Sequence, residues 1–326
     1  MLLYQNYERG FKMKILIVGY FTDTSKLNII NCFPKEWDIV IVPPGEEMLH
    51  HIEDCQVIIP EHVKIDRNLL LKAKQLRLVQ TGAGYDNVDI DACTQLGIWA
   101  ANAAGVNANA VAEHVMAFIL SYYKNIPLLD GFMKNKTDQN QLEYTGSELE
   151  GKTIGIIGFG AIGKKVARLC KAFDMNVLVY TRTTAVQSYE NVQITDFDNL
   201  VRTSDIVTVH SALNQQTQKL IDKEVFRKMK NTALFINTAR GRIVNEEDLI
   251  EALKNREISG ACLDVFETEP LSIDSELRNL SNVILTPHTA GMPDGLKLHK
   301  KRYDFFVKNI RCVENGEEPE SRLNQL

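Results

Sequence analysis

Three side chains that can bind a carboxylate or move a proton each follow a short apolar run of this sequence. They are Arg240, Glu269 and His288. The runs before them have the length of buried strands and span 233–238, 260–265 and 283–286. Open parallel sheets bind their ligands beyond the carboxyl ends of their strands. Any one of these side chains alone could be an ordinary surface residue, but the three together predict one site for acid–base chemistry.

The three side-chain types suit a reaction in which charge develops on an oxygen atom. Histidine ordinarily titrates near neutral pH, so His288 is the candidate general acid and base. Glu269 could orient the imidazole and favour its protonated form, because an opposite charge nearby has that effect. The planar fork of Arg240 suits a carboxylate and a developing alkoxide.

A second group of residues predicts a dinucleotide site. Between Lys152 and Cys170 a β-branched apolar run, a glycine turn and a helical pattern follow one another directly. In a G-x-G-x-x-G turn the first glycine permits the bend, the second lets backbone approach a pyrophosphate, and the third lets the helix pack closely. The pyrophosphate would bind the N–H groups at the start of the helix. The turn here consists of Gly158, Phe159, Gly160, Ala161, Ile162 and Gly163.

This hexamer alone could be a glycine-rich turn without function, but its place between a strand and a helix favours the dinucleotide site. A hydride that passes from a nicotinamide ring to a carbonyl leaves charge on the oxygen, so a proton donor must meet that oxygen. We therefore expect the glycine turn and His288 to serve one hydride-transfer reaction. His210, at the end of another predicted strand, could border the cofactor, although a structural role is the simpler interpretation.

A further glycine pair could bind an anion. The run from Thr81 to Asp89 follows another predicted strand and contains Gly82 and Gly84. Two glycines so close together can turn successive N–H groups into one concavity, which would suit a substrate carboxylate. The alternative interpretation is a plain turn.

Two sheets are needed to position these residues. Short apolar runs alternate with helix-length segments, first from Lys14 to Ala101 and again from Ile154 to Thr286. The alternation predicts an α/β fold of two Rossmann- or flavodoxin-like, doubly wound parallel-sheet domains with a cleft between them. A chain of 326 residues is long enough for both domains.

The composition excludes several classes of protein. A net charge of −5 and the lack of any basic run argue against a nucleic-acid partner. The six cysteines include no C-x-x-C pair, so we expect no metal site and a reducing, cytoplasmic location. No apolar stretch approaches the ~18 residues that a membrane span needs, so we expect no membrane partner.

Residues 107–124 have helical spacing with apolar side chains on most faces. A helix of this kind is buried between domains or against another subunit, so we expect a homodimer. Glu113 and His114 lie within this helix. Because neighbouring helical residues face different sides, we interpret them as satisfied polar groups and not as a metal-binding pair.

Several motifs occur in an order that resembles the D-isomer-specific 2-hydroxyacid dehydrogenases, of the glyoxylate or hydroxypyruvate reductase type or like a phosphoglycerate dehydrogenase without its regulatory domain. The resemblance covers nearly the whole chain from Lys14. It implies a discontinuous substrate domain, residues 1–105 and 291–326, and an NAD(P)-binding Rossmann domain, residues 106–290. The motifs are Gly82–Asp89, Gly158–Gly163, Asn237–Gly241, Leu263–Pro270 and Thr286–His288.

The resemblance also implies roles for individual residues. Arg240, Glu269 and His288 would form the catalytic set, and Arg240 would also bind substrate. Ala83 and Gly84 would offer N–H groups to the substrate carboxylate. Asp264 would hold the carboxamide of the nicotinamide. Besides the glycine hexamer, the residues implied to bind the cofactor are Thr181, Arg182, Thr183, Thr238, Ala239 and Asp264.

Two features depart from the usual pattern of the family. Where NAD-preferring members carry an acidic residue for the ribose 2′-hydroxyl, this chain has Thr181, followed by Arg182 and Thr183. An arginine there can pair with a 2′-phosphate, so NADP(H) is slightly favoured over NAD(H). The segment before Gly151 lacks the tryptophan expected in the dimer arm.

The sequence thus predicts an NAD(P)-dependent oxidoreductase that interconverts a small 2-keto acid and a D-2-hydroxy acid. The alternative is an NAD(H)-sensing binding protein of the corepressor type, because corepressors of that type resemble the same fold and can retain the catalytic residues. The side-chain pocket that would identify the substrate depends on loops whose shape the sequence does not reveal.

Overall fold

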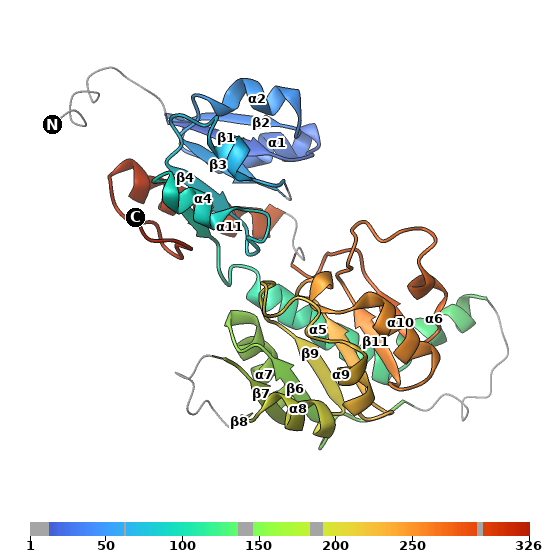
Figure 1. Cartoon of the computed structure of the whole chain (residues 1–326). Helices are drawn as coiled ribbons and strands as arrows, with labels where there is room; N and C mark the ends of the chain where they lie inside the picture. Colours follow the sequence, from blue (N-terminus) through green and yellow to red (C-terminus); the bar gives the residue numbers. More distant parts are fainter. Residues whose placement is uncertain (1–12, 62, 136–145, 183–191, 292–295) are drawn as a thin grey trace. The chain divides into compact units, whose positions relative to one another are not determined.

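The computed structural model of the chain describes residues 13–61, 63–135, 146–182, 192–291 and 296–326. The described residues belong to two compact units, and the chain passes between them twice. Unit 1 combines Met1–Val106 with Asp294–Leu326, and unit 2 is Asn107–Pro293 (Figure 1). Unit 1 therefore contains the blue start of the chain in Figure 1 together with its red end.

Unit 1 is built around a five-stranded parallel sheet with the strand order β2-β1-β3-β4-β5. The direction of winding reverses between β1 and β3, and sheets of this kind bind ligands at such a reversal. The strands are β1 (Lys14–Val18), β2 (Asp38–Val42), β3 (Val57–Pro60), β4 (Leu78–Thr81) and β5 (Trp99–Asn102). The helices are α1 (Asp23–Ile30), α2 (Glu46–Ile52), α3 (Arg67–Leu70), α4 (Ile90–Gln95) and α11 (Leu296–Glu314).

Both faces of this sheet are buried. In β1, Leu16 and Val18 belong to the core that α2, α3 and α4 cover, whereas Ile15 and Ile17 belong to the core on the other face. Helix α11 packs on that second face and contributes Phe306 to its core. Parallel strands that are buried on both sides read as unbroken apolar runs, which is the pattern that predicted them.

Unit 2 is built around a seven-stranded parallel sheet with the strand order β12-β11-β10-β9-β6-β7-β8. Its winding reverses between β6 and β9. The strands are β6 (Thr153–Ile157), β7 (Asn176–Tyr180), β8 (Gln193–Ile194), β9 (Ile206–Val209), β10 (Leu234–Asn237), β11 (Gly260–Leu263) and β12 (Val283–Leu285). The helices are α5 (Ala108–Tyr123), α6 (Ile126–Lys134), α7 (Ala161–Ala172), α8 (Phe197–Thr203), α9 (Lys223–Lys228) and α10 (Glu246–Lys254), with 3-10 turns at Gly241–Ile243 and Glu276–Asn279.

The two faces of the second sheet also carry separate cores. Helices α5 and α7 cover one face, where Val115 and Val166 are fully buried. Helices α8, α9 and α10 cover the other, where Leu200, Phe226 and Leu253 are buried. The apolar faces of α5 are thus used inside unit 2, because this helix packs against the sheet, α7 and α6.

The predicted α/β fold with two doubly wound parallel sheets is confirmed. The strands predicted from apolar runs lie within a residue or two of the observed ones. Strand β8 was not predicted, because Gln193 and Ile194 are both exposed and form no apolar run. Helix α6 ends at Lys134, and residues 136–145 lie outside the described part of the chain.

Candidate active site

The carboxyl edge of the unit 2 sheet brings the predicted acid–base residues together. Arg240 follows β10, Glu269 follows β11 and His288 follows β12, and these three strands are neighbours in the sheet. Nδ1 of His288 lies 2.6 Å from Oε2 of Glu269. The side chains are about one-third exposed, at 32% for His288 and 34% for Glu269, so a ligand can reach them.

The charge on Glu269 decides the direction of this hydrogen bond. Partial burial opposes ionisation of Glu269, but hydrogen bonds from His288 and from the N–H of Phe266, together with the charge of Arg240, outweigh burial and lower the pKa of the carboxyl. The Phe266 N–H donates to Oε1 over 3.0 Å. An ionised carboxylate can only accept, so Nδ1 of His288 donates its proton. The imidazole is thereby fixed in orientation and tautomer.

A buried carboxylate anchors the loop that carries His288. The side chain of Asp264 is 1% exposed, and its Oδ1 accepts hydrogen bonds from the Thr286 hydroxyl at 2.6 Å and the Thr289 N–H at 2.8 Å. Its Oδ2 accepts from the Ala290 N–H at 2.9 Å. The backbone N–H of His288 donates to the Asp264 carbonyl oxygen at 2.8 Å. These bonds hold His288 in the left-handed region, at φ 56°.

The same carboxylate was predicted to hold the nicotinamide carboxamide. An ionised carboxylate offers about four acceptor positions, so three bonds to its own loop leave room for one further donor. The structure therefore gives Asp264 a role that the sequence did not reveal, as the anchor of the His288 loop. The contact with the carboxamide stays a prediction.

His114 supports this anchor from α5. Its Nε2 lies 3.0 Å from the Thr286 hydroxyl and 3.9 Å from Oδ1 of Asp264. Because the Thr286 hydroxyl gives its only proton to Asp264, it accepts from His114, so Nε2 of His114 carries a proton. Burial lowers the pKa of His114 more than the charge of Asp264 raises it. Glu113 is exposed, so the two side chains do not act as a pair.

The loop of Arg240 is locked to the loop of Glu269. Gly241 packs so closely that an added Cβ would lie 1.8 Å from the carbonyl carbon of Phe266. The next peptide N–H, that of Glu267, donates to Oε2 of Glu246 at 3.0 Å. Burial raises the pKa of Glu246. Sequence reasoning missed Glu246, since an acidic residue in the first turn of a helix is common.

The Arg240 loop also has internal support. The Asn237 amide donates to the Arg240 carbonyl oxygen and accepts from the Ala239 N–H, both over 3.0 Å. Asn237 is 1% exposed, so these bonds fix the backbone beyond β10.

The glycine turn has the form that a pyrophosphate requires. Gly158 has φ 97°, which side chains rarely adopt. A Cβ on Gly163 would lie 2.3 Å from the Gly158 carbonyl oxygen, so only glycine lets α7 approach β6 this closely. A Cβ on Gly160 would meet no atom within 4 Å, which leaves open space beside the backbone. Of the other predicted turn residues, Phe159 is buried. Ala161 is exposed and Ile162 is half-buried, and both lie in the first turn of α7.

Several polar atoms beyond β9 and β10 suit a polar ligand. Nδ1 of His210, Oγ of Ser211 and Oγ1 of Thr238 are buried and have no hydrogen-bond partner among the described residues. Nε2 of His210 lies 3.0 Å from the Thr208 hydroxyl, and burial lowers the pKa of His210 to about 3, so this ring is neutral. Buried polar groups normally have partners, so these unpaired atoms mark this part of the sheet edge as a candidate position for a polar ligand.

The predicted cofactor-choice residues lie beyond β7. Thr181 is half-buried and Arg182 is exposed, and Nη1 of Arg182 donates to Oε1 of Gln216. Thr183 lies outside the described residues.

The predicted carboxylate-binding residues lie beyond β4 in unit 1. Ala83 and Gly84 are half-buried, and the Asn102 amide donates to the Ala83 carbonyl oxygen at 2.8 Å. Within the described part of the chain, the N–H groups of Ala83 and Gly84 have no acceptor. These two donors therefore suit an anion.

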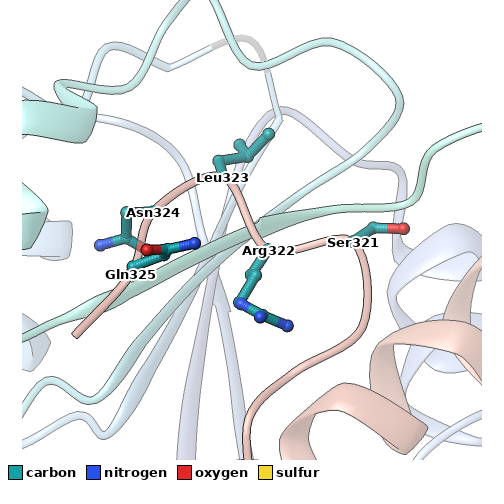
Figure 2. A pocket seen from close by; sticks show the side chains of 5 residues that line it. All are labelled: Ser321, Arg322, Leu323, Asn324 and Gln325. Atoms are coloured by element: carbon teal, nitrogen blue, oxygen red, sulfur yellow. The ribbon is translucent and has the colours of Figure 1, made fainter. Parts of the chain in front are cut away.

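A hollow on unit 1 lies at the end of the chain and contains none of the candidate residues (Figure 2). The segment that lines it runs beside β5, where the Leu323 N–H donates to the Ala100 carbonyl oxygen at 2.7 Å and Asn324 accepts from the Ala100 N–H at 2.9 Å. We assign this hollow no part in the chemistry. Its lining residues are Ser321, Arg322, Leu323, Asn324 and Gln325.

Two kinds of feature are absent from the described residues. Among them, no group of three or more His, Cys, Asp or Glu side chains is placed to hold a metal ion. None of the described helices is both long and apolar enough to cross a membrane.

The fold and the glycine turn are typical of a dinucleotide-binding protein, and the same sheet carries the His288–Glu269 hydrogen bond at its carboxyl edge. The family model of the D-isomer specific 2-hydroxyacid dehydrogenase NAD binding domain matches residues 116–290. Together with the relatives below, this match shows that the chain belongs to the D-isomer-specific 2-hydroxyacid dehydrogenase family. The resemblance predicted from the motifs is thus confirmed, and the family supports a nicotinamide-dependent oxidoreductase.

Curated relatives and solved structures agree with this family. A D-3-phosphoglycerate dehydrogenase of Archaeoglobus fulgidus is 40% identical over 249 residues, which are 75% of this chain and 47% of that protein. The chain thus spans about half of that relative. A glyoxylate reductase of Thermofilum pendens is 36% identical over 89% of this chain and 86% of that protein. The structure of an NAD-dependent formate dehydrogenase from Staphylococcus aureus with NAD has a TM-score of 0.84 at 29% identity, covering 96% of this chain and 99% of that one.

The contact between Glu246 and the Glu267 N–H gives a first prediction. Glu246→Ala removes the acceptor and leaves a partly buried N–H unpaired, which should lower the free energy of unfolding by about 1–3 kcal/mol. Glu246→Gln keeps an oxygen acceptor and should cost less than about 1 kcal/mol. Urea unfolding measures both values. Glu247→Ala changes the exposed neighbour and should stay within about 0.5 kcal/mol of wild type. Equal losses for the Ala and Gln variants would contradict the role of this hydrogen bond.

Proposed function

We propose that this protein is an NAD(P)-dependent dehydrogenase that interconverts a small 2-keto acid and the corresponding D-2-hydroxy acid, with glyoxylate or hydroxypyruvate as the leading substrates. The observation that carries the proposal is the His288–Glu269 pair at the carboxyl edge of a sheet that also carries a dinucleotide turn. The family match and the relatives named glyoxylate reductase support it.

The proposed mechanism assigns one task to each residue. When bound, the reduced nicotinamide supplies the hydride that the carbonyl carbon gains. Nε2 of His288, as imidazolium, gives its proton to the carbonyl oxygen, and Glu269 stabilises that imidazolium through Nδ1. Arg240 binds the substrate and the oxygen on which charge develops. In the reverse direction His288 takes the proton back from the hydroxyl group.

We propose that one unit binds the substrate and the other binds the cofactor. We assign substrate binding to the discontinuous unit, predicted as residues 1–105 and 291–326, with the N–H groups of Ala83 and Gly84 as the carboxylate site. We assign the cofactor to the unit predicted as residues 106–290. There the glycine hexamer would hold the pyrophosphate, while Thr238, Ala239 and Asp264 would lie at the nicotinamide end.

The reaction can be tested with reduced cofactor and a panel of 2-keto acids, followed by the loss of cofactor absorbance. His288→Ala should lower turnover by roughly 10²- to 10⁴-fold while cofactor affinity stays nearly unchanged, because only the proton donor is lost. His50→Ala, which removes an exposed histidine of α2, is the matched control. Turnover of the His288→Ala enzyme within a few-fold of wild type would contradict this assignment.

The same panel separates the reductase from the NAD(H)-sensing alternative. Cofactor binding without turnover of any 2-keto acid would favour the sensor. The relatives reported above are named as enzymes, which favours the reductase.

We propose NADP(H) as the preferred cofactor, because Thr181 stands where an acidic residue would repel a 2′-phosphate and the exposed Arg182 can pair with it. A charge-assisted contact is worth roughly 1.5–3 kcal/mol, or about ten- to a hundredfold in affinity. Thr181→Asp with Arg182→Ala should therefore lower the ratio of kcat/KM for NADPH over NADH at least ~10-fold.

The control for this prediction is Arg202→Ala, which removes an exposed arginine from α8. The ratio should not change in that variant. A wild-type enzyme that already prefers NADH, or an unchanged ratio in the double variant, would show that the loop does not set the choice.

We also propose a homodimer, supported by α6 and no longer by α5. Helix α6 has no buried residue in the single chain, although Ile126, Leu128 and Met133 are apolar and 51%, 46% and 79% exposed. A second copy that covers this face would remove that apolar area from water. Light scattering at micromolar concentration should give the mass of two chains, and the mass of one chain would contradict the proposal.

We place the protein in the cytoplasm, because all six cysteines are free thiols. Four of them are buried, and burial raises the pKa of Cys55, Cys93 and Cys170 to about 12, so these thiols are inert. The net charge of −5 gives no reason to expect a nucleic-acid partner.

A further inference from the structure

The carboxyl edge of the unit 1 sheet contains a buried ion pair where its winding reverses. Gly19 follows β1 and Glu61 follows β3, the two strands between which the strand order changes direction. The Glu61 N–H donates to the Val18 carbonyl oxygen at 2.8 Å, and a Cβ on Gly19 would lie 2.8 Å from Cβ of Glu61. Ligands of open α/β sheets bind at this kind of position.

The partner of Glu61 comes from the far end of the chain. Nη2 of Arg302, on α11, donates to Oε1 of Glu61, and the side chains are only 15% and 16% exposed. The guanidinium carbon lies 5.1 Å from the centre of the Phe306 ring. Burial disfavours the charged form of Arg302, but the charge of Glu61 outweighs burial and raises the pKa, so the guanidinium stays protonated.

This guanidinium packs against the start of the predicted carboxylate loop. A Cβ on Gly82 would be 3.3 Å from Nη2 and 3.4 Å from Cζ of Arg302, so a side chain at this position would press on the arginine. The next two residues, Ala83 and Gly84, have N–H groups without an acceptor in the described chain. Nε of Arg302 is also buried without a hydrogen-bond partner there. Two open backbone donors thus directly follow the residue against which this positive charge packs.

Glu61 decides how much of that charge an anion experiences. A unit charge at about 6 Å in a protein environment changes the affinity for an anion by roughly 10- to 100-fold. The positive charge of Arg302 would stabilise one carboxylate on the loop. The negative charge of Glu61, at the same sheet edge, would offset that attraction for any second carboxylate of the ligand.

We propose that the Glu61–Arg302 pair sets the charge selectivity of the substrate site, so that the enzyme accepts 2-keto acids with one carboxylate and rejects those with two. The inference rests on the proposed function, since it assigns the loop of Ala83 and Gly84 to the substrate carboxylate. Glu61 and Arg302 act as specificity-determining residues and take no part in the proton transfer.

The test compares two ligands of nearly equal size that differ by one charge, oxaloacetate and its amide 2-oxosuccinamate. Glu61→Gln removes the negative charge but keeps an oxygen that accepts from Arg302. The ratio of kcat/KM for oxaloacetate over 2-oxosuccinamate should rise at least ~10-fold, mainly through KM. Dissociation constants of the two acids, measured by calorimetry with oxidised cofactor present, should give the same shift without any turnover.

Two further variants make the test specific. Glu47→Gln changes the net charge equally at an exposed position of α2 and should leave the ratio unchanged. The double variant Glu61→Gln with Arg302→Met removes both charges and fills the space of the arginine side chain, so it serves if the single variant folds poorly. It should weaken binding of both acids.

The possible outcomes separate this inference from the proposed function. If the wild-type enzyme reduces 2-keto acids but Glu61→Gln changes only its melting temperature and leaves both ratios at the wild-type value, the pair is structural and the inference is overturned. If the wild-type enzyme reduces no 2-keto acid, the proposed function fails, and the two dissociation constants still decide whether Glu61 sets charge selectivity.

Discussion

The hydrogen bond from Nδ1 of His288 to Glu269 is the interaction on which the candidate site depends. It fixes the tautomer of the ring and leaves Nε2 as the atom that, in the proposed function, exchanges a proton with a substrate. Two further carboxylates hold the pair in place. Asp264 accepts hydrogen bonds from the loop that carries His288. Glu246 accepts from the N–H of Glu267, and the N–H of the preceding residue, Phe266, donates to Glu269.

The two sheets place their candidate ligand-binding residues in the same way. In each unit these polar residues lie beyond the carboxyl ends of parallel strands. In unit 2 the glycine turn follows β6, at the reversal of winding, where we propose that it binds a pyrophosphate. In unit 1 the loop that begins at Gly82 packs against the guanidinium of Arg302. Each unit thus pairs backbone donors with a charge or a helix start.

The sequence predicted the parts of this protein that depend on local pattern. Buried parallel strands appear as unbroken apolar runs, and the glycine hexamer must stand between a strand and a helix, so both were readable from the chain. Because Arg240, Glu269 and His288 each follow an apolar run, the rule for parallel sheets also predicted that they share one edge. The doubly wound topology followed from the alternation of strands and helices.

The contacts that support the site were not readable, because they join residues far apart in the chain. Glu61 and Arg302 are 241 positions apart, and His114 and Thr286 are 172 positions apart. Each of these side chains looks ordinary in its own segment. The apolar faces of α5 led to the expectation of a dimer, yet they pack within unit 2, so that pattern could not distinguish a buried helix from an interface.

The most direct test of the central claim is the tautomer of His288, measured by NMR on protein with ¹⁵N-labelled histidine and assigned by the signal that His288→Gln removes. When the ring is neutral, an ionised Glu269 requires that the proton lie on Nδ1 and that Nε2 carry none. We expect this tautomer in wild type. A neutral His288 with its proton on Nε2 would contradict the role given to Glu269, because Glu269 would then not be the acceptor that orients the ring.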